Sequence, residues 1–303
     1  MKKILFFASA LLVVSSCEIV IHPTELEHVK IGVAAMDMSD FPQTKADLEI
    51  IDNIARFSWE ASDVVGMFPD RGAQAYFEMA DHEGKEVAEF DGGGWALKGA
   101  SKYSVYYPYS YDHRERTSIP LSYKGQIQRE KNTYRHIKDF QHLATGAEIP
   151  QNGTCNYEME RAEAIVRFRL TLPRIAIYEE ITIKIADGSS IVTSSRLDVS
   201  GDSYQISPDT AEDRFTVSLE EFSTSVENEE VDIYMMLPPQ DLSTKKLIIS
   251  VNTIEGDCCQ AEVDGKNMLN NKAYQYSAIL TTEFGSRGED FEGIEGNWNK
   301  NKE

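Results

Sequence analysis

Residues 162–172 alternate between apolar and polar side chains, and this pattern constrains the fold more than any other feature of the chain. The apolar side chains of one parity are Ala162, Ala164, Val166, Phe168, Leu170 and Leu172. The polar side chains of the other parity are Arg161, Glu163, Arg167, Arg169 and Thr171, with Ile165 as the exception. A period of two is that of a β-strand with one buried and one wet face. We therefore expect a half-buried strand whose arginines, including Arg167, face water.

Shorter runs of strand-like character recur along the chain. They cover residues 30–35, 56–59, 64–68, 75–79, 103–107, 181–185, 231–235, 247–251 and 274–280. Turn pairs such as Asp187-Gly188 and Asp264-Gly265 separate them, and no long window has a clean period of 3.6 residues. Many short strands joined by such turns predict an all-β chain built of antiparallel β-sandwiches.

The domain boundary is expected near residues 150–157. Residues 108–156 are polar and irregular, whereas the alternation becomes clean after Tyr157. We therefore predict an N-terminal sandwich at 28–154 and a C-terminal sandwich at 155–283, followed by an acidic and polar tail at 284–303.

The first 17 residues have the pattern of a bacterial export signal. Lys2 and Lys3 precede an apolar run over residues 4–14, which is shorter than the roughly 20 residues that a membrane-spanning helix needs. The sequence Val14-Ser15-Ser16-Cys17 resembles a lipobox, in which the cysteine carries lipid. We expect residues 1–16 to be removed and residues 17–27 to form a lipid-anchored linker. The alternative is an ordinary secretory signal that happens to end near a cysteine.

The charge balance excludes some partners. The chain has 50 acidic and 30 basic side chains, a net charge of −20. Phosphate backbones need basic patches, so nucleic acid is not an expected partner. The catalytic and nucleotide-binding motifs that we sought are missing, and no cofactor is expected. His136, Asp139 and His142 lie in a polar stretch without metal-ligand spacing, so we predict neither a metal site nor an enzyme.

Three cysteines remain besides Cys17. In an oxidising compartment, Cys155 could pair with Cys258 or with Cys259. Buried thiols are the alternative, and the sequence does not decide between them.

A tyrosine-rich segment also has two interpretations. Its members are Tyr103, Tyr106, Tyr107, Tyr109 and Tyr111. They predict a strand in the core followed by a Tyr-Pro-Tyr turn, or else an exposed platform that stacks on sugar rings.

Several short sequence segments, taken in their order along the chain, resemble those of the fimbrillin family, which comprises the type V pilus subunits and related surface lipoproteins of Bacteroidales-type bacteria. They begin with the lipobox and the strand at 30–35. Three further segments follow at 57–68, 103–108 and 236–239. The last segment, at 265–276, leads into the final predicted strand. The resemblance implies two tandem transthyretin-like antiparallel β-sandwich domains. It also implies a fimbrial subunit at the outer membrane and cell surface, whose partners are other fimbrial subunits and the membrane that holds its lipid.

The resemblance further implies proteolytic processing behind the first strand. The matching bond here joins Lys45 to Ala46, with Arg56 as a second position. The family more often has arginine where this chain has Lys45, so an Arg-specific protease is in doubt. An anchor-type subunit that is never cut is the alternative.

Two functions therefore stay open from sequence. The first is a structural and adhesive fimbrial subunit that assembles by strand exchange. The second is a carbohydrate-binding surface lipoprotein of a nutrient-uptake system, with host or bacterial surface glycans as partners.

Overall fold

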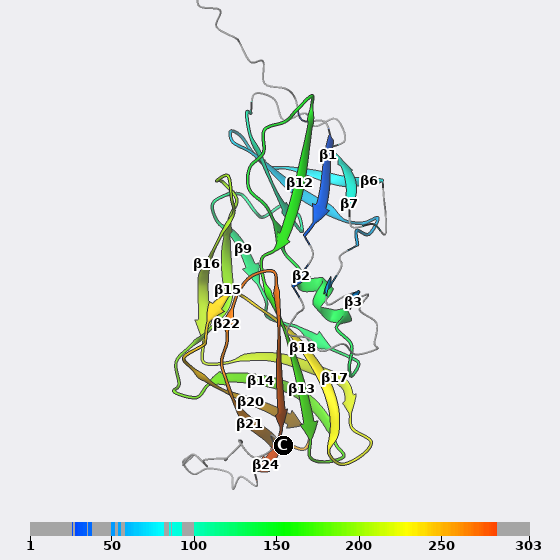
Figure 1. The fold of residues 1–303 in the computed structure, drawn as a ribbon, viewed down its shortest axis with the longest axis vertical. Coiled ribbons are helices and arrows are strands. Elements are labelled where there is room, and N and C mark those ends of the chain that lie inside the picture. Colours follow the sequence, from blue (N-terminus) through cyan, green and yellow to red (C-terminus); the bar gives the residue numbers. More distant parts are fainter. Residues whose placement is uncertain are drawn as a thin grey trace, which may run out of the picture.

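The computed structural model describes residues 26, 28–34, 36–37, 50–51, 54–55, 58–81, 85, 87–92 and 100–283. Cys17, Lys45, Ala46, Arg56 and the tail at 284–303 lie outside these ranges. The described chain is almost entirely β-strand, which confirms the all-β prediction, and its one helix is the 3-10 helix η1 (Arg135–Phe140). No helix within the described ranges is long and apolar enough to cross a membrane. Figure 1 shows two parts stacked along the long axis of the molecule.

Seven strands of the upper part close into a barrel. In spatial order they are β1 (His28–Val33), β12 (Thr154–Arg161), β11 (Leu143–Ala144), β8 (Tyr103–Tyr107), β5 (Val64–Pro69), β6 (Ala75–Asp81) and β7 (Val87–Asp91). A sandwich would leave the edges of two sheets apart, whereas here β1 pairs with both β12 and β7. The first part therefore differs from the open sandwich that the alternation suggested, because β1 closes its seam.

The lower part contains two six-stranded sheets. One consists of β10 (Ile127–Gln128), β17 (Phe215–Ser223), β14 (Ile177–Ile185), β20 (Lys246–Thr253), β21 (Cys258–Asp264) and β24 (Thr281–Glu283). The other consists of β18 (Glu229–Leu237), β13 (Ala164–Leu172), β23 (Lys272–Ile279), β2 (Met36–Asp37), β4 (Ile54–Ala55) and β3 (Ile50–Ile51). One hydrophobic cluster contains side chains from both sheets, as a sandwich requires.

Smaller sheets complete the fold. β9 (Ile119–Ser122), β15 (Ile191–Asp198) and β16 (Gln205–Glu212) form a three-stranded sheet, and β19 (Gln240–Asp241) pairs with β22 (Asn267–Met268). β9 and β10 thus pair with strands of the lower part, although they precede the expected boundary. The main change of sheet comes between Arg161 and Ala164, because β12 belongs to the barrel throughout its length.

The predicted burial of the apolar side chains over 162–172 is confirmed, whereas the predicted exposure of the polar side chains is wrong. Phe168 and the other apolar members are fully buried in β13 and the turn before it. Arg161, Glu163 and Arg167 are buried as well, although we expected them to face water. A covering element contributes to this burial, since η1 packs on β18, where His136 Nε2 lies 3.1 Å from the carbonyl of Tyr234, the residue opposite Arg167.

Side-chain amides close the free edge of β18. Gln126 accepts a hydrogen bond from the backbone N–H of Met236 at 2.8 Å and donates to its carbonyl at 2.8 Å. Gln128 accepts from the N–H of Tyr234 at 2.8 Å and donates to the carbonyl of Asp232 at 3.1 Å. These amides take the place of a neighbouring strand, so the edge offers no ladder to another chain.

The cysteines lie in separate cores. Cys155 is buried on β12 in the barrel, and Cys259 is buried on β21 in the sandwich. No disulfide joins Cys155, Cys258 or Cys259 in the structure as described. Cys155 and Cys259 are therefore buried thiols in different hydrophobic clusters, and Cys258 is a half-buried thiol.

Candidate functional site

β1 closes the barrel by pairing with the strands on both sides of its seam. It runs parallel to β12, from His28 opposite Thr154 to Val33 opposite Met159. It runs antiparallel to β7 over residues 28–32. Figure 1 shows β1, in blue, beside the green β12. We call the position between β12 and β7 the β1 groove.

The side chains of β1 alternate between the core and water. Val29 and Ile31 are 1% and 0% exposed, and Leu26, just before the strand, is also fully buried. Lys30 is exposed and Val33 is half-buried. Val29 and Ile31 therefore point into the barrel core, on the same parity as Val33. Full burial of such a side chain contributes roughly 1.5–3 kcal/mol, so β1 adds hydrophobic contacts as well as hydrogen bonds.

Large apolar side chains belong to the same cluster as these residues. They include Trp59, Phe77, Phe90 and Met159, all fully buried. The Trp59 and Phe90 rings meet edge to face, with centroids 4.9 Å apart. Without β1, part of this cluster would face water, and the seam would carry two rows of unpaired backbone groups.

The chain after β1 passes from the barrel to the sandwich. The N–H of Ala34 donates to the carbonyl of Met159 at 2.8 Å, and Asp37 of β2 then pairs with Lys272 of β23. β2 also pairs antiparallel with β4. Lys45 and Ala46 lie between β2 and β3 in sequence, outside the described residues. A cut between them would leave β1 and β2 held by noncovalent contacts alone.

β12 forms one wall of the groove, and our sequence analysis missed it. Cys155, Tyr157, Met159 and Arg161 are buried, while the residues between them are exposed. The same period of two is visible in the sequence. The predicted boundary near residues 150–157 overlaps β12.

The tyrosine-rich segment is mainly strand core. Tyr103 and Tyr106 are buried in β8, whereas Tyr107 and Tyr109 are half-buried. Tyr111 is 68% exposed, and the guanidinium of Arg114 lies 4.0 Å from its ring centroid. The five residues therefore do not form one exposed platform.

His136 and His142 form separate local contacts, and Asp139 is exposed. His136 Nε2 lies 3.1 Å from the carbonyl of Tyr234, and the N–H of His142 donates to Glu163 at 3.2 Å. In the part of the chain that the structure describes, no group of three or more potential ligands is arranged around a metal site.

Comparison with known proteins supports the lipid anchor and the fold. A family model described as a prokaryotic membrane lipoprotein lipid attachment site matches residues 1–17 and so ends at Cys17. No curated protein sequence matches the chain. A candidate cell adhesion protein from Bacteroides ovatus has a TM-score of 0.54 at 14% identity, over 85% of this chain and 95% of that one. A second, from Bacteroides uniformis, has a TM-score of 0.50 at 12% identity, over 86% and 96%.

The chain has the fold of these two Bacteroides proteins. A fimbrial anchor protein, Mfa2 from Porphyromonas gingivalis, covers 83% of this chain and 90% of its own at 9% identity. Its TM-score is 0.38. The shared fold therefore rests on the two Bacteroides structures.

Proposed function

We propose that this chain is a lipid-anchored subunit of a surface fimbrium, with a structural and adhesive role rather than a catalytic one. The observation that carries the proposal is the position of β1, a single strand that closes the seam of an apolar barrel. The lipid attachment match supports an anchor at Cys17, which we place in the outer membrane. The fold shared with two candidate cell adhesion proteins and the sequence resemblance to fimbrillins support the same role.

We propose two tandem domains of the transthyretin-like type, the first of which is completed by β1. Cleavage between Lys45 and Ala46 would allow β1 to leave, and a strand from another subunit would then fill the β1 groove. The incoming strand would have to pair with β12 and β7 and bury apolar side chains at the positions of Val29 and Ile31. Strand addition of this kind derives its affinity from main-chain hydrogen bonds and its specificity from alternate side chains.

A peptide-exchange experiment tests this function. The purified chain is cut by limited trypsin treatment, and the new N-terminus is sequenced to verify cleavage before Ala46. A fluorescent peptide with the sequence of residues 26–34 is then added, and its binding is followed by anisotropy. We expect capture by the cut chain and no capture by the intact one.

Two controls separate strand exchange from nonspecific binding. The Lys45→Ala chain should resist the cut and fail to capture the peptide. A peptide carrying Ile31→Asp should not bind to the cut chain, because its carboxylate would enter the apolar core. If the cut chain keeps its own β1 and never takes up the peptide, the proposed exchange is wrong.

A further inference from the structure

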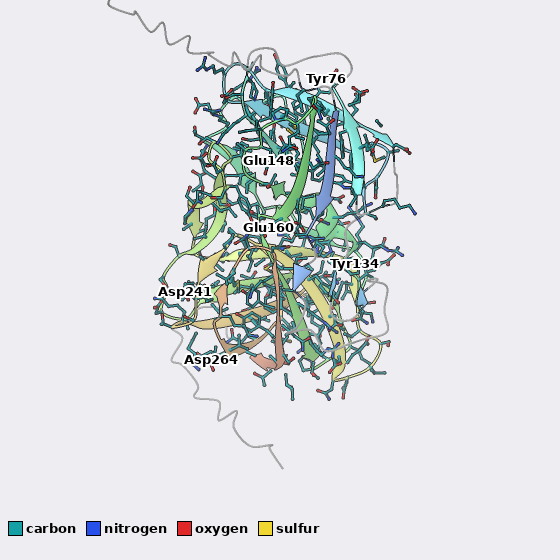
Figure 2. The ribbon with its side chains drawn as sticks, turned by 45° about the horizontal axis from the view of Figure 1, so that its top comes forward. Tyr76, Tyr134, Glu148, Glu160, Asp241 and Asp264 are labelled. Carbon is teal, nitrogen blue, oxygen red and sulfur yellow. The ribbon has the colours of Figure 1, made fainter. Side chains whose placement is uncertain are left out.

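A cleft lies where the barrel meets the sandwich, and no residue of β1 lines it. Its volume is about 460 Å³, within the roughly 300–1,000 Å³ that is typical of small-ligand sites. The barrel side contributes Asp63 and Tyr107, and the sandwich side contributes Tyr134 and the end of η1. Figure 2 labels Tyr134 near this junction and Tyr76 at the far end of the barrel. We call this space the junction cleft.

Two tyrosines supply aromatic surface to the cleft. Tyr107 is half-buried, and its hydroxyl donates to Asp63 Oδ1 at 2.9 Å. Tyr134 is also half-buried, and its ring packs against that of Tyr234, with the ring centroids 6.0 Å apart. Rings held in this way present apolar area with little loss of side-chain freedom on binding.

Hydrogen-bond acceptors lie beside these rings. Asp139 is exposed at the cleft and forms no hydrogen bond or ion pair with any described residue. The Oε1 atom of Gln141 is buried and has no partner in the described structure. An ionised carboxylate can only accept hydrogen bonds, so this part of the cleft suits a ligand rich in hydroxyl donors.

The charges of the cleft disfavour an anion. Glu60, Asp63 and Asp139 line it together with the cations Lys138 and Arg161. Lys138 Nζ lies 3.2 Å from Glu60 Oε1, which balances one of the carboxylates. The whole chain adds a net charge of −20. A neutral ligand avoids the resulting repulsion.

We propose that the junction cleft binds one neutral pyranose unit of a glycan. The sugar hydroxyls would donate to Asp139 and Gln141, and the apolar face of the ring would pack on Tyr107 or Tyr134. The cleft shares no residue with β1, so the binding does not depend on strand exchange. It would give the subunit a carbohydrate target at the point where its two parts meet.

Saturation-transfer NMR on the intact chain tests the proposal. The probes are the methyl glycosides of glucose, galactose and mannose, N-acetylglucosamine, and the anionic N-acetylneuraminic acid. We expect at least one neutral probe to bind with a dissociation constant of about 10 mM or below. Asp139→Ala and Tyr134→Ala should each weaken that binding by about tenfold or more.

Matched variants outside the cleft locate the binding. Asp112→Ala and Tyr111→Ala replace exposed residues of the same types and should leave the affinity unchanged. Because Asp139 is exposed, its replacement leaves the core intact, and circular dichroism checks the Tyr134 variant. The proposal is overturned if no neutral probe binds, if only N-acetylneuraminic acid binds, or if Asp139→Ala has no effect. Loss of binding in Tyr111→Ala would place the sugar on the exposed tyrosine surface instead.

Discussion

Arg167→Ala should lower the free energy of unfolding by about 3 kcal/mol. The Arg167 side chain is 2% exposed, and its Nη2 donates to Oδ2 of Asp232, whose side chain is 12% exposed. Removing one partner of a buried ion pair costs roughly 3–5 kcal/mol, because the other charge is left without compensation. Asp232 keeps Arg169, whose Nε lies 3.1 Å from Oδ1, so the lower end of the range is expected.

The loss of unfolding free energy in Arg167→Ala should also depend on pH. Burial raises the pKa of Asp232 above its ordinary value, and Arg169 opposes this effect. A carboxyl group with a raised folded-state pKa binds its proton more tightly in the folded state, so stability falls as the pH rises through that range. Without Arg167, this pKa should rise further. The destabilisation should therefore be smaller at about pH 5 than at about pH 7.

Urea unfolding at both pH values measures the effect. Arg129→Ala is the matched control, since its side chain is 66% exposed and pairs with Glu220 at 2.9 Å. Arg129→Ala should lower the free energy of unfolding by less than about 1 kcal/mol. Equal losses for the two arginines, with unchanged dependence on urea, would refute the buried pair. They would favour the exposed position of Arg167 that the alternation alone predicts.

Four further predictions follow from the structure and the sequence. Phe168→Ala should cost about 3–5 kcal/mol in urea unfolding, because the buried ring stacks on that of Tyr276. Gln128→Ala should cost about 1–3 kcal/mol, since it leaves the N–H of Tyr234 without its acceptor. Burial raises the pKa of Glu163, so stability should fall as the pH rises above the ordinary glutamate range, and Glu163→Gln should flatten that fall. Cys17→Ala should abolish incorporation of labelled palmitate and release the protein from the outer membrane fraction.

Each of these variants has a control or an outcome that contradicts it. Phe140→Ala and Gln205→Ala replace less buried residues of the same types and should cost less than the core variants. Glu179→Gln removes an exposed carboxyl group and should not change the pH dependence. Continued palmitate labelling of the alanine variant at position 17 would show that the lipobox interpretation is wrong.

Much of the strand content could be predicted from the sequence, because side-chain alternation is a local property. The apolar parity of 164–172 and the inward position of Ile31 follow directly from the period of two. The pairing of one strand with another is not a local property. β1 pairs with β12, whose residues lie more than a hundred positions away, through backbone groups that are alike in every residue. The side-chain pattern therefore showed that strands exist, but it did not show that they close a barrel.

The burial of the polar parity also required the tertiary structure. Arg167 has the pattern of a solvent-facing residue in its own strand, but it is buried in the fold, where η1 packs on β18 beside Tyr234, the residue opposite Arg167. The junction cleft has the same origin, since Asp63, Tyr107 and Asp139 come from separate segments. The sequence by itself determined most of the strands, the acidic composition and the expected lipid anchor, which depend on neighbouring residues or on composition. The seam, the buried ion pair and the cleft were decided by contacts between distant segments, which only the folded chain brings together.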